Sequence, residues 1–219
     1  MDASAIACSL SDMHIPESIT ERDDYRRCAE FHGHTCMGLT IGYLAAKAAL
    51  ELLEEARSVD EELICIAETD ACGCDAIQVL TGCTFGKGNF IYRNIGKMAF
   101  TFASRSSGKG FRLVLKSELR DIPDEERDLR EKIRDSQATA EQIKQYETLY
   151  QQRSAHWFAR PPADFFTITK VTAPLPPTAR IAPSEYCTSC GEEVMVTKLT
   201  TREEEKLCQD CLHSTPVSE

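Results

Sequence analysis

Four cysteines near the carboxyl end form the pattern with the clearest chemical meaning in this sequence. Two Cys-x2-Cys pairs, Cys187 with Cys190 and Cys208 with Cys211, are separated by residues 191–207. Four thiolates spaced in this way match the tetrahedral ligand shell of a structural zinc ion. The segment is too short to bury a useful apolar core, so the metal would supply its folding energy. Two disulfides are the alternative interpretation.

A second group of reactive side chains, His32, His34 and Cys36, comes just before a predicted helix. In an extended chain alternate side chains share one face, so two imidazoles and one sulfur would lie together. Cys36 would also begin the helix, where free N–H groups favour a thiolate. Imidazole and thiolate suit zinc or another transition metal. The pattern predicts a second metal site or a catalytic site, the alternative being two surface histidines beside a buried cysteine.

A third stretch, residues 68–89, carries carboxylates, thiols and glycines directly after a predicted strand. That composition suits a site at which the backbone must approach a ligand. The candidates are Cys72 and Cys83 as metal ligands, Asp70 and Asp75 as catalytic bases, and Lys87 as the holder of an anionic group. The glycines of this stretch lack the spacing of a P-loop, so no nucleotide site is predicted.

An α+β domain is expected to position these groups. A helix is predicted over residues 39–57, where Leu, Ala, Glu and Lys dominate and no proline intervenes. A further helical turn is predicted at 75–80. Short apolar or alternating runs predict strands at 63–69, 97–105, 110–116 and 164–171. A hairpin signal between two of these strands makes the sheet at least partly antiparallel.

The predicted organisation is an α+β core over residues 1–172, a proline-rich linker over 173–183 and a four-cysteine zinc finger over 184–219. The core includes a long charged helix at 124–157 with only a narrow apolar stripe. A helix with so little apolar surface commonly lies outside a domain or contacts a second subunit. We therefore expect a homodimer, formed through this helix and the glycine-containing face of the 39–57 helix.

The composition of the 219-residue chain excludes several classes of function. Its net charge of −10 disfavours nucleic acid as a partner, because phosphates would be repelled. The chain has 11 cysteines but no secretory signal in residues 1–16, which indicates metal ligands or redox groups and a cytoplasmic location. No apolar run is long enough to cross a membrane, so no membrane partner is expected.

Three segments together resemble the FmdE family, named for the E component of formylmethanofuran dehydrogenase: Phe31–Cys36 followed by Gly38 and Gly42, then Asp70–Asn89, then Gly96–Phe102. The resemblance is specific, because the middle run is long and its order unusual. It implies an α+β core with a cysteine-containing site in a cleft, and a zinc finger appended through a linker. It also implies a link to the molybdenum- or tungsten-pterin dehydrogenase that reduces CO2 onto methanofuran.

Three functions are compatible with these observations. The first is a zinc-binding accessory protein or subunit of a molybdenum or tungsten oxidoreductase, which the resemblance implies. The second is an independent metalloenzyme, in which His34 and Cys36, with Cys72 or Cys83, hold a metal and an aspartate is the base. The third is a zinc-dependent interaction or regulatory protein that uses the core cysteines and histidines as a ligand sensor. The sequence leaves open whether the protein is an enzyme and which metal the core binds.

Overall fold

A computed structural model of the protein describes residues 17–119, 122–172, 175–178 and 181–213. Residues 1–16, in which no secretory signal is predicted, lie outside the described residues. The chain divides into two compact units, Met1–Thr178 and Ala179–Glu219. The first unit contains a mixed sheet with helices packed on it, and the second carries the four clustered cysteines. The predicted α+β class is confirmed.

The sheet of the larger unit has five strands in the order β2-β1-β3-β4-β5. Their bounds are β1 Leu63–Ala67, β2 Phe90–Tyr92, β3 Ala99–Ser104, β4 Gly110–Leu115 and β5 Phe166–Lys170. β1 and β2 are parallel and are joined through helix α5 (Gly73–Thr81), whereas all other neighbours pair antiparallel. The segment that follows β1 therefore leads from the end of a buried strand straight into a helix, a frequent place for a ligand site.

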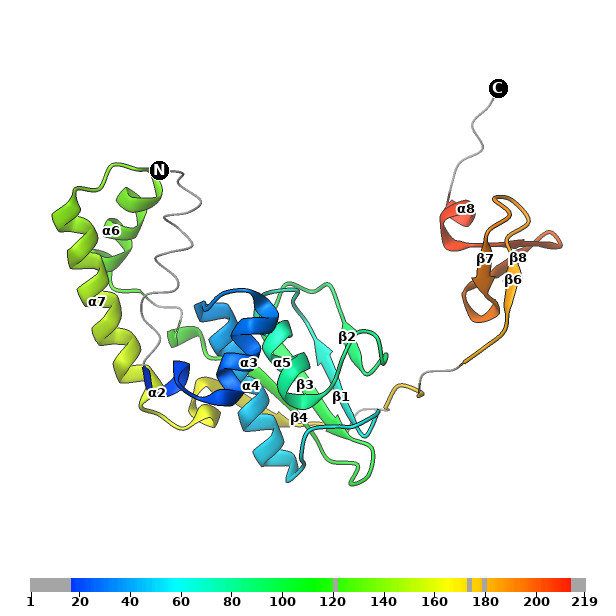
Figure 1. The fold of residues 1–219 in the computed structure, drawn as a ribbon, viewed down its shortest axis with the longest axis horizontal. Coiled ribbons are helices and arrows are strands. Elements are labelled where there is room, and N and C mark those ends of the chain that lie inside the picture. The colour runs from blue at the N-terminus through cyan, green and yellow to red at the C-terminus, as the bar shows by residue number, and fades with distance from the viewer. Residues whose placement is uncertain (1–16, 120–121, 173–174, 179–180, 214–219) are drawn as a thin grey trace. The chain divides into compact units, whose positions relative to one another are not determined.

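Helices α3, α4 and α5 cover one face of this sheet (Figure 1). Among the described residues, the helices that precede α5 are α2 Glu17–Thr20, α3 Asp23–His32 and α4 Met37–Leu53. Between helices and sheet lies one apolar core, whose largest fully buried side chains include Tyr25, Leu39, Tyr43, Ile77, Phe100 and Leu113. Burying one such side chain contributes about 1.5–3 kcal/mol. The core therefore fixes α3, α4 and α5 firmly against β1, β3 and β4.

Glycines set the distance between α4 and α5. A Cβ atom built on Gly42 would lie 2.1 Å from the carbonyl oxygen of Gly73, far inside van der Waals contact. On Gly38, one turn earlier, it would lie 3.2 Å from Cβ of Cys72. The two helix backbones therefore touch, which only residues without side chains permit. The contact places Cys72 beside the amino-terminal end of α4.

The range predicted as one helix, 124–157, holds two, α6 (Asp124–Arg134) and α7 (Ala140–Phe158), so the prediction of a single helix is wrong. Ser136 takes a left-handed conformation with φ 57°, which ends the first helix. Thr139 and Gln142 then form a reciprocal capping box that begins the second. The Thr139 N–H donates to Oε1 of Gln142 at 3.0 Å, and the Gln142 N–H donates to Oγ1 of Thr139 at 3.3 Å.

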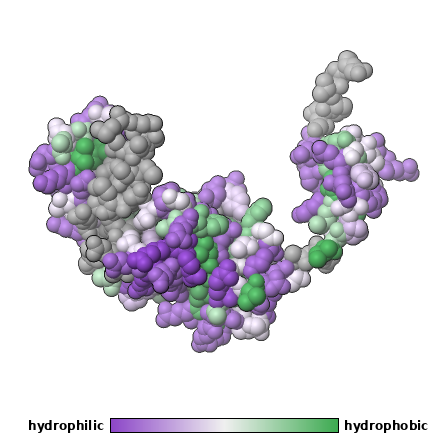
Figure 2. All heavy atoms as spheres, in the orientation of Figure 1, coloured by the Kyte–Doolittle hydropathy of each residue, from purple (hydrophilic) through white to green (hydrophobic). Residues whose placement is uncertain are grey.

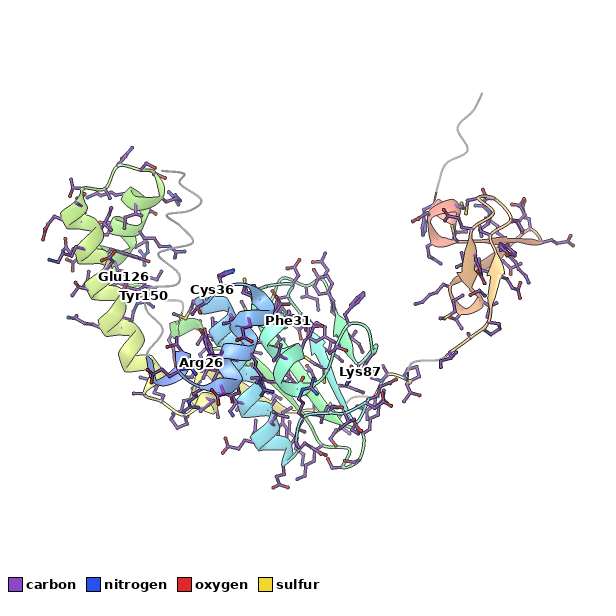
Figure 3. The ribbon with its side chains drawn as sticks, viewed as in Figure 1. Arg26, Phe31, Cys36, Lys87, Glu126 and Tyr150 are labelled. Atoms are coloured by element: carbon purple, nitrogen blue, oxygen red, sulfur yellow. The ribbon has the colours of Figure 1, made fainter. Side chains whose placement is uncertain are left out.

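A charged pair is buried between α6 and α7. Arg153 donates from Nε and Nη2 to the two carboxylate oxygens of Glu126, at 2.9 and 2.6 Å. The Glu126 side chain is 2% exposed and that of Arg153 is 15% exposed. Arg153 also lies over the ring of Tyr150. Figure 3 labels Glu126 and Tyr150 on the helical hairpin that α6 and α7 form. The apolar side chains of this second small core are Leu129, Ile133, Tyr146 and Tyr150.

Short 3-10 helices connect the hairpin to the sheet, η1 (Ser117–Leu119) before α6 and η2 (Pro162–Phe165) before β5. The smaller unit consists of two two-stranded hairpins, η3 (Val196–Lys198) between them, and a terminal helix. Its remaining elements are β6 Ser184–Tyr186, β7 Glu193–Met195, β8 Thr200–Arg202, β9 Glu205–Leu207 and α8 Gln209–His213. Strands this short cannot form a stable sheet without a further cross-link.

The surface drawn in Figure 2 is mostly hydrophilic, and its apolar residues lie in small separate groups. Several aromatic side chains are nevertheless well exposed, among them Phe31 at 61%, Tyr186 at 69% and Phe85 at 80%. Across the described ranges, no helix combines the length and the apolar composition that a membrane span needs.

Replacing Gly42 by Ala tests the contact between α4 and α5. Alanine is intrinsically better in a helix by about 0.8–1 kcal/mol, but its Cβ would collide with backbone atoms that cannot rotate away. We expect overpacking to win and to lower the free energy of unfolding by about 1–3 kcal/mol. Urea unfolding followed by circular dichroism measures the change.

The matched control is Gly86→Ala, because no atom lies within 4 Å of the Cβ position at Gly86. Its effect should stay below about 0.5 kcal/mol. Equal stabilities of the two variants would show that the glycine contact does not constrain the helices.

Candidate metal centres

The junction between α3 and α4 brings three donor groups together. α3 ends at His32, where Gly33 takes the left-handed conformation with φ 92° and turns the chain. His34 lies in the connection, and Cys36 is the N-cap of α4. One ligand atom from each of His32, His34 and Cys36 lies within 4.8 Å of the others. We call these three residues the core cluster; a helix end, a turn and a helix start produce it, and not the extended chain that the sequence suggested.

The imidazole of His32 is held by a carboxylate. Its Nδ1 lies 2.7 Å from Oδ2 of Asp75, in the first turn of α5. In the tautomer that donates from Nδ1 to this carboxylate, Nε2 is the nitrogen available to a metal ion. Nε2 faces Sγ of Cys36 at 3.9 Å, and the ring of His34 packs beside that of His32, with centroids 4.4 Å apart. Such a carboxylate orients an imidazole for metal binding.

Cys36 is not a ready thiolate. The Leu39 N–H donates to its Sγ at 3.3 Å, as expected at a helix start. Burial has the larger effect, and together with the neighbouring Cys72 thiol it raises the pKa of Cys36 to about 11. The helix start thus lowers the pKa of Cys36, as the sequence predicted, but burial outweighs this effect in the protein without a bound cation. A divalent metal ion would reverse this balance, because coordination deprotonates a thiol.

Cys72 and Cys74 have different environments. Cys72 precedes α5, is half-buried and lies close to Cys36, although it is not part of the core cluster as defined by the 4.8 Å distances. Cys74 is buried, and its Sγ donates to the carbonyl oxygen of Thr69 at 3.2 Å. Cys72 is therefore the thiol of this pair that can join chemistry at the core cluster.

Cys83 and Asp70 lie outside the core cluster. Cys83 follows α5, at the opposite end of that helix from Cys72, and is fully buried. Its burial raises the pKa of the Cys83 thiol to about 11. Asp70 is exposed and accepts a hydrogen bond from the Tyr92 hydroxyl at 3.3 Å. The structure thus separates two residues that the sequence placed in one candidate site.

Lys87, the predicted holder of an anion, is engaged elsewhere. Its Nζ donates to the backbone carbonyl oxygens of Val59 at 3.2 Å and Asp60 at 2.7 Å. Figure 3 shows Lys87 and Cys36 well apart. The lysine therefore ties a loop that precedes β1 to the loop that follows α5, and it does not face the core cluster.

The smaller unit brings its four cysteines together, and we call them the four-cysteine cluster. One sulfur from each of Cys187, Cys190, Cys208 and Cys211 lies within 4.8 Å of the others, and Sγ of Cys190 is 4.0 Å from Sγ of Cys208. In a tetrahedral site with Zn–S bonds of about 2.3 Å, two sulfurs are about 3.8 Å apart. Gly191, with φ 74°, turns the chain after the second cysteine. The four sulfurs therefore have the spacing of a four-thiolate metal site.

The thiols of this cluster differ in acidity: the pKa of Cys190 is raised to about 12, because desolvation and the neighbouring thiols outweigh a hydrogen bond from the Glu192 backbone, whereas that of Cys187 is lowered. Hydrogen bonds from the backbone of Cys190 and then of Cys208 lower the pKa of Cys187 to about 6. Among the described residues of the smaller unit, only Cys187 and Leu207 are buried. All four cysteines are free thiols in the structure, and no disulfide joins them. With so little apolar burial these hairpins need a further cross-link, and a metal ion held by the four cysteines would supply it.

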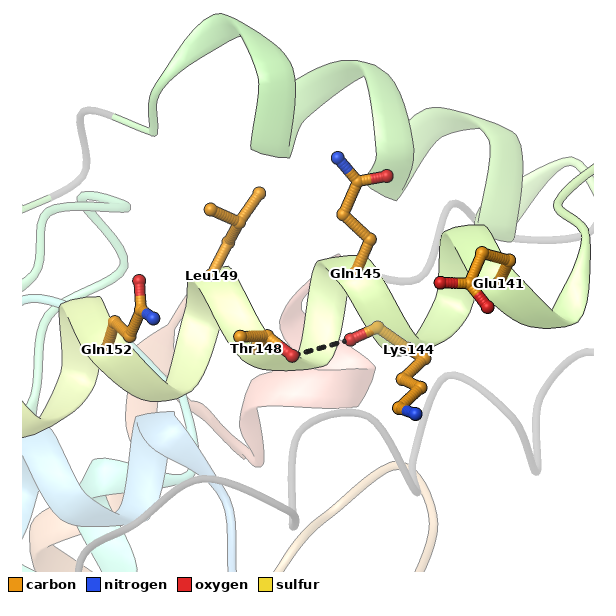
Figure 4. A pocket seen from close by; sticks show the side chains of 6 residues that line it. All are labelled: Glu141, Lys144, Gln145, Thr148, Leu149 and Gln152. Atoms are coloured by element: carbon orange, nitrogen blue, oxygen red, sulfur yellow. Dashed lines mark hydrogen bonds between the residues drawn. The ribbon is translucent and has the colours of Figure 1, made fainter.

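A shallow groove of about 270 Å³ runs along α7 (Figure 4). Its lining consists of Glu141, Lys144, Gln145, Thr148, Leu149 and Gln152. All six come from one helix, and the Thr148 hydroxyl donates back to the carbonyl oxygen of Lys144. None of these six side chains is a cysteine or a histidine, and together they do not pair a nucleophile with a base or form a set of metal ligands. We therefore describe the groove as one face of a helix and not as a reactive site.

The fold and the two donor clusters define an α+β protein with two candidate metal centres. The family described as "FmdE, Molybdenum formylmethanofuran dehydrogenase operon" matches residues 31–167, and the chain belongs to this family. The match includes the core cluster, Cys72 and Asp75, and it ends before the four-cysteine cluster. The predicted family membership is therefore confirmed.

Individual proteins similar to this chain include one of known structure and one relative from an archaeon. A crystal structure of a tungsten formylmethanofuran dehydrogenase FmdE-like protein from Syntrophus aciditrophicus matches with a TM-score of 0.55 and 25% identity, over 88% of this chain and 94% of that one. A "Probable S-adenosyl-L-methionine-binding protein" of Archaeoglobus fulgidus is 29% identical over 194 residues. The match covers 86% of this chain and 52% of that relative, so the chain spans about half the relative's length.

Proposed function

We propose that the protein is a metal-binding accessory protein or subunit of a molybdenum- or tungsten-dependent oxidoreductase related to formylmethanofuran dehydrogenase. It holds a structural zinc ion at the four-cysteine cluster and a second metal ion at the core cluster. The observation that carries the proposal is the convergence of His32, His34 and Cys36 within 4.8 Å, with His32 oriented by Asp75. Two imidazoles and a thiolate are a donor set for zinc and neighbouring transition metals.

The two candidate centres differ in the number of ligands that they supply and in the cost of deprotonating those ligands. The four-cysteine cluster supplies a complete tetrahedral shell, so its zinc would be structural and slow to exchange. The core cluster supplies three donors, and binding must also remove the proton from a buried thiol whose pKa is about 11. The core metal is therefore expected to be the weaker of the two and the first lost to a chelator. Cys72 is the nearest candidate for a fourth ligand.

The accessory role rests on family membership and on the likeness to the FmdE-like protein of S. aciditrophicus. The ligand named for the A. fulgidus relative is not carried over, because about half of that relative lies outside the match. Homodimer formation stays a prediction. One of the two arguments for it, the glycine-containing face of the 39–57 helix, does not hold, because Gly42 packs against Gly73 inside the larger unit and offers no free face.

One observation favours an independent metalloenzyme as the second candidate. Three protein donors leave one position of a tetrahedral metal open, as catalytic zinc sites do. In that case Asp75 would act by orienting His32, because its carboxylate is already engaged with the imidazole. Asp70 does not contact the core cluster in the structure, and its assignment as a base remains a prediction, as does the zinc-dependent regulatory role.

Elemental analysis tests the two-centre proposal. Gently purified protein should carry more than one metal equivalent, falling to one after treatment with a mild chelator. Cys36→Ser should abolish the weaker equivalent alone, and Cys190→Ser should abolish the tighter one and unfold only the smaller unit. A single zinc that disappears with Cys190→Ser, and no core metal under any loading condition, would overturn the core site.

Asp75→Asn probes the orientation of His32. An amide can present its NH2 group to Nδ1 and favour the wrong tautomer, so metal affinity at the core cluster should fall by about 10–100-fold. Asp70→Asn is the control, because this exposed carboxylate contacts no member of the core cluster. Competition with a chromophoric chelator measures both variants, and the affinity of the four-cysteine cluster should not change in either. Equal core affinities in the two variants would contradict the assignment.

Affinity capture from the native host at native expression tests the accessory role. A molybdenum or tungsten oxidoreductase should be recovered with the full-length chain. Recovery of the chain without any such enzyme, from cells that express one, would contradict the accessory role. The independent metalloenzyme would then be the better-supported candidate function.

A further inference from the structure

Two thiols meet where α4 and α5 begin. A Cβ atom built on Gly38 would lie 3.8 Å from Sγ of Cys36 and 3.7 Å from Sγ of Cys72. Gly73, directly after Cys72, lies against the backbone of Gly38: a Cβ atom built on Gly73 would lie 2.9 Å from the Gly38 carbonyl oxygen. A disulfide requires Cα atoms within about 7 Å. Both sulfurs border the same Cβ position at Gly38, so the two helix starts bring these thiols close to each other.

Accessibility separates Cys72 from the other described thiols of the larger unit. Cys28, Cys65, Cys74 and Cys83 are all buried, and the thiols of Cys28 and Cys74 donate to backbone carbonyl oxygens at 3.2 Å. Cys72 is half-buried, and among the described cysteines of this unit it is the one that solvent reaches. An accessible thiol beside a buried one is the arrangement of an attacking and a resolving cysteine.

We propose that Cys36 and Cys72 form a thiol–disulfide exchange site whose co-substrate is a low-molecular-weight disulfide, and that its oxidised form cannot hold a metal at the core cluster. The second half rests on the proposed function, because it requires Cys36 to be a metal ligand. The first half stands without it.

The exchange proceeds in two displacements. The Cys72 thiolate attacks one sulfur of the disulfide RSSR, forms a mixed disulfide and releases the first RS⁻. Cys36 then attacks Sγ of Cys72 and releases the second RS⁻, and the two protons that the two cysteines lose convert both RS⁻ to RSH. Two thiols are oxidised to one disulfide, and RSSR is reduced by the same two electrons. The new bond removes the sulfur of Cys36 from the three donors of the core cluster.

Oxidised glutathione is a suitable probe. The full-length chain, stripped of its core metal and reduced, is incubated with it under anaerobic conditions, and remaining free thiols are then alkylated. Peptide mass spectrometry should find Cys36 linked to Cys72 in the wild type. Cys74→Ser, which removes the neighbouring buried thiol, should retain this link, and Cys72→Ser should lose it. Absence of the link in the wild type, or linkage of Cys72 to Cys74 instead, would overturn the proposal.

The metal readout separates the two halves. The oxidised wild type should bind no core metal and should regain binding after reduction, and metal-loaded protein should form the link at least about tenfold more slowly than stripped protein, because a coordinated thiolate is withheld from exchange. A link that forms without any effect on core metal binding would overturn the second half. If the reduced protein binds no core metal at all, the proposed function fails while the exchange site is still judged by the peptide result.

Discussion

The contact of one helix backbone with another at Gly42 and Gly73 is the constraint on which the candidate site depends. With no side chain between them, α4 and α5 approach until backbone atoms touch. Because α5 is held there, its first turn delivers Asp75 to His32, and the residue before it, Cys72, to Cys36. A larger residue at this point would separate the carboxylate from the imidazole it orients. The chemistry of the site thus depends on two residues that have no functional group.

Burial and backbone hydrogen bonds act in opposite directions on the cysteines of the two candidate centres. In the larger unit, burial raises the pKa of Cys36 to about 11, and a helix start alone cannot compensate for lost hydration. In the four-cysteine cluster, the sulfur of Cys187 accepts several backbone N–H groups, and its pKa falls to about 6. The same cluster also holds Cys190, whose pKa is raised to about 12 by desolvation and the neighbouring thiols. In both clusters, therefore, a bound cation would have to displace protons from thiols.

Local patterns predicted much of the fold, whereas contacts between distant residues were beyond their reach. Alternation and a hairpin signal correctly indicated β3 and β4, and the Cys-x2-Cys spacing indicated the four-cysteine cluster. The short β2 carried too weak a pattern. The start of α7 has a signal in the sequence, the capping signature Thr139-x-x-Gln142. The high charge content on both sides of it favoured one continuous helix. The pairing of Asp75 with His32 joins two helices and leaves no periodic trace, so the sequence suggested a base where the structure has an orienting carboxylate.

The buried pair of Glu126 and Arg153 carries an evolutionary consequence. Loss of either partner would strand a charge without solvent, at a cost of about 3–5 kcal/mol, against a total stability for a typical domain of about 5–15 kcal/mol. An apolar pair of similar volume would cost little, but a lineage reaches it only through an intermediate that holds one of the charges alone. Selection should therefore keep both residues or exchange both. Across homologous chains these two positions are expected to covary, even though neither takes part in binding a metal.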